Sequence, residues 1–180
     1  YIILVNEGSS QFAIVAPYNG TSVTITPSVQ IGSHPPGIPF SVTLNQGQTY
    51  QLSGSNISGT LITSDKKIAV YSGSTCVNIP TNLGTCNAIL EQLLPTDMAG
   101  KEFITIPFAT RVGDTVRFLA LNDGTEIVIN GNTPIILNKG QVYNTILKDA
   151  AHITANQPIF VNQFSNGLRF DSFPGYGVGS

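Results

Sequence analysis

Hydrophobic and polar residues alternate along most of this chain in short runs. Residues 23–26, 41–44 and 126–129 follow a period of two, and the runs are rich in Val, Ile, Thr, Phe and Tyr. Turn-forming residues such as Gly, Asn, Asp and Ser separate the runs at short intervals. Antiparallel strands with one buried face show this alternation. The pattern therefore predicts an all-β fold.

The runs occur twice, in the same order. Four segments of the first half return in the second: 1–5 as 103–107, 12–21 as 116–125, 44–50 as 137–143, and 62–70 as 153–161. Repetition of this kind indicates a repeated structural unit. We predict internally duplicated antiparallel β-sandwich units of about seven strands each. Residues 1–98 would form the first unit and residues 99–180, with a Gly-rich tail, the second.

One segment departs from the strand pattern. Residues 87–94 place four aliphatic side chains on one helical stripe, with Asn87 as a cap and Pro95 as a stop. The spacing predicts one short helix that links the two units.

The two units differ most in one loop. The segment between Gly20 and Gly47 is longer than its counterpart between Gly124 and Gly140. The additional residues lie around a proline-rich turn that we expect to project from the common core. It is a candidate ligand loop with the residues Gln30, His34, Pro35 and Pro36; the alternative is a tolerated insertion.

Charge is sparse in this chain. Charged residues make up 10% of the sequence and the formal net charge is −2, whereas 41% of residues are hydrophobic. Such a surface offers no field that would attract nucleic acid or anionic lipid. No apolar run is long enough to span a bilayer as a helix. We therefore expect neither a nucleic-acid partner nor membrane insertion.

Cys76 and Cys86 flank a short segment. A disulfide between them would close a surface loop and contribute about 2–3 kcal/mol; the alternative is two free buried thiols. We expect the disulfide and an extracellular location, secreted or at the cell surface, because the uncharged polar composition suggests a secreted protein. Asn19 and Asn56 begin glycosylation sequons in form. The chain opens in a strand and ends in a Gly-rich stretch, so we expect a piece of a longer protein.

The sequence contains no pattern of residues typical of catalysis. His34 lies in a proline turn and His152 in a predicted strand, and neither is near a recognisable nucleophile motif. The acidic residues are scattered, without a calcium-loop pattern or a conspicuous pair. Two thiols and two histidines support zinc poorly. We predict no enzymatic activity, no cofactor and no metal.

A more specific signal lies in residues 61–103. Residues 61–76, then 77–80, Cys86, 91–95 and 100–103 resemble, in this order, the N-terminal domain of the IgG-Fc-binding protein family; residues 163–165 also fit. The resemblance implies an extracellular, cysteine-bridged β domain without enzymatic activity. The chain departs from the family pattern at residues 87–88 and 98–99. For this reason we do not extend to it the immunoglobulin binding of some relatives.

Two functions agree with these observations. The first is a non-catalytic adhesion or recognition module that binds a protein or glycan ligand. The second is a structural subunit of an extracellular filament or sheath, in which copies of the chain join by strand addition. The candidate assembly strand is the uninterrupted apolar segment at the start of the chain: Tyr1, Ile2, Ile3, Leu4 and Val5.

Overall fold

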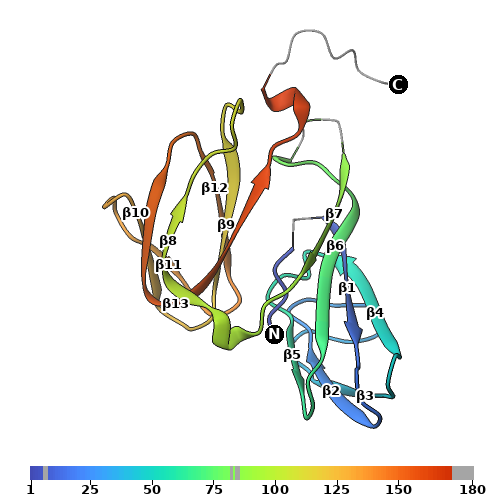
Figure 1. The fold of residues 1–180 in the computed structure, drawn as a ribbon. Coiled ribbons are helices and arrows are strands. Elements are labelled where there is room, and N and C mark those ends of the chain that lie inside the picture. Colours follow the sequence, from blue (N-terminus) through green and yellow to red (C-terminus); the bar gives the residue numbers. More distant parts are fainter. Residues whose placement is uncertain (6–7, 82, 84–85, 172–180) are drawn as a thin grey trace.

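The computed structural model describes residues 1–5, 8–81, 83 and 86–171. These residues form an all-β structure of thirteen strands and two short 3-10 turns, η1 (Thr96–Met98) and η2 (Leu168–Phe170). Figure 1 shows two sandwich-like bodies side by side, the first coloured blue to green and the second yellow to red. The predicted all-β class is confirmed.

The first body contains two antiparallel sheets. One has the order β4-β1-β6-β7 and the other the order β3-β2-β5. Their strands are β1 (Ser9–Val15), β2 (Thr21–Thr26), β3 (Phe40–Leu44), β4 (Thr49–Ser55), β5 (Leu61–Ser64), β6 (Ala69–Val77) and β7 (Asn87–Gln92). Alternate residues of these strands, among them Phe12, Ile14, Val23, Ile25 and Ile62, are buried between the sheets. The period-two pattern thus places one face of each strand in the core.

The second body has one continuous set of paired strands, in the order β11-β10-β13-β9-β12, with β8 also paired to β13. Its strands are β8 (Gly100–Thr105), β9 (Asp114–Ala120), β10 (Thr125–Ile129), β11 (Ile135–Leu137), β12 (Val142–Leu147) and β13 (Ala151–Ser165). The long strand β13 shifts register between Thr154 and Ile159. Its first part pairs with β8 and β10, and its last part with β9. One irregular strand therefore serves both layers.

The turns at Gly20 and Gly124, one in each body, are held by equivalent hydrogen bonds. Gly20 and Gly124 have φ of 60° and 64°, a conformation that glycine adopts without strain. The Gln46 N–H donates to Asn19 Oδ1 at 3.0 Å, and the Lys139 N–H donates to Asp123 Oδ1 at 2.9 Å. The halves thus share this geometry, and duplication of one ancestral unit stays a prediction.

The two bodies meet over a small apolar cluster. Ile2 and Leu4 of the first half are buried against Leu119 of β9 in the second. Beside them, the fully buried Arg117 donates from its guanidinium to the Val5 carbonyl oxygen and, at 2.6 Å, to Asn144 Oδ1. Apolar packing and a buried cation together join the halves.

The predicted linking helix is wrong. Residues 87–92 form the strand β7, which runs antiparallel to β6. Gly73 of β6 permits this approach, because a Cβ there would collide with the Ile89 carbonyl oxygen. The disulfide also holds Cys86 next to Cys76 of β6. The residues that follow Cys86 therefore begin beside that strand. Pairing with β6 overrides a weak local preference for helix.

Candidate ligand-binding groove

A groove of about 680 Å³ lies between the two halves. Its walls come from residues 88–94, in and after β7, and from residues 160–165 of β13. In Figure 1, β7 and the end of β13 lie on the sides of the two bodies that face each other. The groove is within the size range of ligand sites in proteins.

Both walls present a strand edge to the groove. Each wall consists of consecutive residues, whereas a sheet face would contribute only every second residue. β7 pairs with β6 alone. Residues 160–165 pair with β9 alone in the part of the chain that the structure describes. Each wall therefore has one side without a neighbouring strand.

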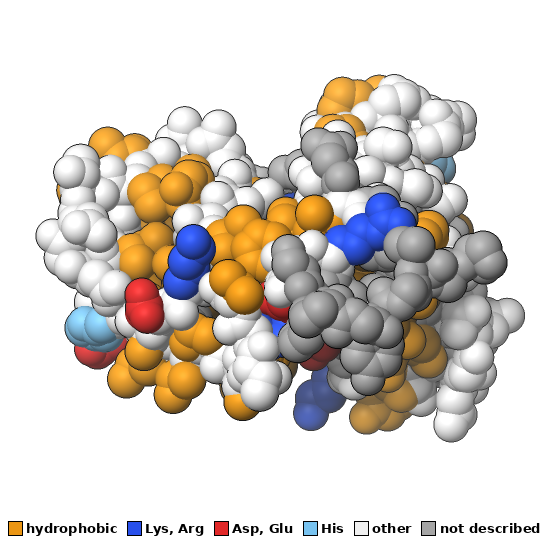
Figure 2. Space-filling model, turned by 90° about the horizontal axis from the view of Figure 1, so that it is seen from above, with side chains coloured by type: hydrophobic (Ala, Val, Ile, Leu, Met, Phe, Trp, Pro, Cys, Tyr) orange, Lys and Arg blue, Asp and Glu red, His pale blue; other side chains and the backbone are white. Residues whose placement is uncertain are grey.

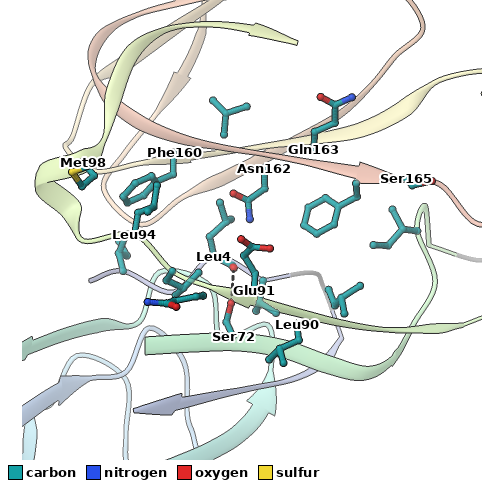
Figure 3. A pocket seen from close by; sticks show the side chains of 18 of the residues that line it. Leu4, Ser72, Leu90, Glu91, Leu94, Met98, Phe160, Asn162, Gln163 and Ser165 are labelled. Atoms are coloured by element: carbon teal, nitrogen blue, oxygen red, sulfur yellow. Dashed lines mark hydrogen bonds between the residues drawn. The ribbon is translucent and has the colours of Figure 1, made fainter. Parts of the chain in front are cut away.

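The groove combines apolar side chains with several polar ones. Glu91 is the one ionisable side chain among the lining residues. Figure 3 shows Glu91 from β7 and Asn162 from β13 both pointing into the groove. At its base, the Ser72 hydroxyl donates to the Leu4 carbonyl oxygen at 3.1 Å. A site of this composition can exclude water from apolar groups and orient a ligand through one carboxylate and several amides.

The rim of the groove exposes large apolar side chains. Leu90 is 75% exposed, and Leu94 and Met98 are also exposed. Figure 3 places Leu94 and Met98 at one end of the groove and Ser165 at the other. Figure 2, which views the molecule from above, shows hydrophobic side chains gathered among few charged ones. An apolar rim around an open groove is typical of an interaction site.

The segment proposed for assembly, Tyr1–Val5, lies largely inside the structure and is not exposed. Ile2 to Val5 are buried, and Ile2 bridges to Leu61 at the start of β5. The Tyr1 hydroxyl donates to the Ile68 carbonyl oxygen at 2.8 Å; burial, and then the Asp97 carboxylate, raises the pKa of this phenol. Ile2, Leu4 and Val5 line the groove, and Ile2 and Leu4 also form part of the interface between the halves. Its place in the structure gives no support to strand donation to another copy.

The proline-rich loop lies far from the groove walls in sequence and lines no part of the groove. Ile31 and His34 form a bridge that closes the turn, and the His34 ring stacks on Phe40 with centroids 3.6 Å apart. Pro35 and Pro36 are exposed, and the Gln30 amide donates to the Gly32 carbonyl oxygen. The internal contacts shape the loop, and its ligand role stays a prediction.

Both sequon asparagines are exposed, and both hold turns. Asn19 Oδ1 accepts from the Gln46 N–H, and Asn56 Oδ1 accepts from the Gly8 N–H at 2.9 Å. Asp123 takes the place of Asn19 in the second half, where it can accept the same hydrogen bond but cannot carry a glycan. Turn formation thus accounts for these residues, and their glycosylation stays a prediction.

Cys76 and Cys86 form a disulfide, which links the end of β6 to the residue before β7. This bond determines one wall of the groove, because it fixes where β7 begins beside β6. The alternative of two free thiols is thereby excluded.

The histidines do not lie at the groove. His152 Nε2 is 2.8 Å from Glu102 Oε1 on the surface, and both side chains are exposed.

Among the described residues, no three His, Cys, Asp or Glu side chains come together as metal ligands. Within the same residues, no helix is long and apolar enough to cross a membrane.

The residues of the groove walls were not predicted as a site. Glu91 and residues 163–165 belong to the segments that carry the family resemblance, and Glu91 also lies in the predicted helix of residues 87–94. The structure brings these two segments to opposite walls of one groove, although they are far apart in the chain. Both segments carry the family resemblance, and this was the sequence signal that could have pointed to the site.

Comparison with known proteins extends the resemblance to nearly the whole chain. A family model described as "IgGFc binding protein" matches residues 1–179. The human protein named "IgGFc-binding protein" is 32% identical over 140 residues, which cover 72% of this chain. The chain spans only 2% of the length of that relative. No solved structure shows a significant match.

Proposed function

This chain belongs to the IgGFc-binding protein family, and from this premise we propose that it is a non-catalytic, extracellular recognition module that binds a protein ligand. The ligand would occupy the groove between the two halves. The observation that carries this proposal is the groove itself, with its open strand edges and exposed apolar rim. The Cys76–Cys86 disulfide supports the extracellular location, because such bonds persist in oxidising compartments.

A protein ligand fits the groove better than a nucleic acid or a metal. Its lining offers one carboxylate and no cation, which disfavours phosphate groups. Aliphatic and aromatic side chains with a few polar groups are instead typical of the centre of protein interfaces. The name of the human relative makes the Fc fragment of IgG a reasonable first probe, without deciding the natural ligand.

Binding experiments with a matched pair of variants test this proposal. The wild-type chain would be measured against human IgG Fc, an array of secreted proteins and a glycan array. Leu90→Asp places a charge at the rim, and Ile136→Asp places one at a position that is 67% exposed and outside the groove. We expect Leu90→Asp to weaken binding of a protein ligand about tenfold or more. The control should bind like the wild type.

Three results would contradict the proposal. One is the absence of any protein ligand on the array and in the Fc measurement. Another is equal weakening by both variants, which would place the binding surface elsewhere. The third is binding to glycans alone.

A further inference from the structure

The two sandwiches differ in one strand. In the first, β6 lies between β1 on one side and β7 on the other. In the second, the end of β13 holds the corresponding place: residues 160–165 pair with β9, which corresponds to β1. No described strand occupies their other side, apart from the single pairing of Gly100 with Ile159. After Ser165, the described chain crosses to the first half, where the Gly167 N–H donates to the Ile79 carbonyl oxygen.

The place beside β13 that no described strand occupies coincides with the groove. Residues 160–165 line the groove consecutively, so their unpaired edge faces it. Six residues of extended chain span about 17–20 Å. The groove is therefore bordered, over the length of an ordinary strand, by backbone groups with the geometry to pair with another strand.

We propose that the groove accepts an extended segment of a protein partner, which adds to β13 as an antiparallel strand. This inference rests on the proposed function and specifies how the ligand binds. The first half supplies the template, since β7 pairs antiparallel with β6 at the corresponding edge. Strand addition of this kind combines main-chain hydrogen bonds with pockets for alternate side chains.

The face of β13 that borders the groove defines the sequence of the incoming strand. Phe160, Asn162 and Phe164 are opposite Leu119, Arg117 and Thr115 of β9 and lie on the outer face of the sheet. Side chains directly across from one another on a sheet interact most strongly. The residues that pair with Phe160 and Phe164 should therefore be apolar.

The residue opposite Asn162 should be basic. Glu91 points into the groove, and it makes no hydrogen bond or ion pair with any described residue. A lysine or arginine on the incoming strand would supply its counter-charge. The site therefore selects a strand in which two apolar residues flank a basic one at every second position.

The probe is a synthetic peptide with this pattern, acetyl-Thr-Val-Thr-Lys-Thr-Val-Thr-amide. Three control peptides accompany it. One has glutamate in place of lysine. The other two keep the sequence and carry N-methyl groups on the amides of one edge or of the other edge. Amide hydrogen exchange of the 180-residue chain is measured by NMR with and without peptide. We expect exchange in residues 160–165 to slow about tenfold at saturation.

The controls separate strand addition from nonspecific adhesion. N-methylation along the edge that pairs with β13 should abolish binding, because it removes main-chain donors. The lysine peptide should bind about tenfold more tightly than the glutamate peptide, and Glu91→Gln should remove this preference. Glu91 is exposed, so the substitution should leave the fold intact.

Several results would overturn the inference. Among them are protection confined to β7, equal binding by both N-methylated peptides, and no peptide binding at millimolar concentration. If the peptide fails while a protein ligand still binds and is weakened by Leu90→Asp, strand addition is wrong and the groove remains the site. If no protein ligand is found either, the proposed function fails as well.

Discussion

Strands β1 and β9 hold corresponding places in the two sandwiches but differ in burial. β1 alternates between buried and half-exposed residues, as expected of a strand with one face in a core. All seven residues of β9 are buried. The outer face of β9 contacts Ile2 and Leu4 of the other half, whereas the outer residues of β1, such as Ala13, stay half-exposed. Burial of the second face thus depends on a neighbour outside the strand's own sandwich.

The first extended segments of the two halves also differ in burial. Tyr1 pairs with Ile62 in the first half, and Phe103 pairs with Ile153 in the second, so Ile2 corresponds to Ile104. Ile2 is 3% exposed, whereas Ile104 is 73% exposed. The same residue type at equivalent places therefore has opposite surroundings. These paired positions allow the contribution of the interface between the halves to be measured.

The largest effect should come from Arg117, which corresponds to Ala13 in the first half. Arg117→Ala removes the guanidinium donor from the Val5 carbonyl oxygen and from Asn144 Oδ1 and opens a cavity between the halves. We expect the free energy of unfolding to fall by about 4 kcal/mol. Urea denaturation followed by circular dichroism measures it.

Arg169→Ala is the control, because this arginine is exposed in η2. It should change stability by less than about 0.5 kcal/mol. Similar losses for the two variants would show that the buried guanidinium does not join the halves.

The next effect compares the equivalent isoleucines directly. Ile2→Ala removes buried aliphatic volume against Leu119, and we expect a loss of about 3 kcal/mol. Ile104→Ala removes an exposed side chain and should cost less than about 0.5 kcal/mol. Thermal and urea unfolding of both variants would test the contrast. If Ile104→Ala destabilised the chain as much as Ile2→Ala, the exposed face of β8 would have to be covered in solution.

The sequence predicted those features that follow from local chemistry. The period of two identified strands, and Gly20 and Gly124 identified equivalent tight turns. The apolar run of residues 1–5 was interpreted as a strand for assembly, yet a run without polar residues also fits a strand buried on both faces, as this one is. The helix at residues 87–94 failed because an apolar stripe alone does not reveal the partner strand β6.

The groove could not be predicted in this way. Glu91 and Asn162 lie on opposite walls of the groove, although they are distant in sequence and belong to different halves. No local pattern encodes how two sandwiches pack against each other. Once the structure is known, the packing is evident from residues at equivalent positions in the two halves that differ in exposure, such as the buried Ile2 and the exposed Ile104.

The smallest expected effect tests the similarity of the halves. Asn45 Oδ1 accepts from the Gly20 N–H at 3.0 Å, and Asn138 Oδ1 accepts from the Gly124 N–H at 3.3 Å. Each substitution to alanine removes one exposed turn hydrogen bond, so each should cost about 1 kcal/mol. The losses should agree within about 0.5 kcal/mol and add in the double variant, since the turns belong to different halves. Urea denaturation of the three variants measures this, and a loss at only one turn would show that the matching hydrogen bonds differ in energetic weight.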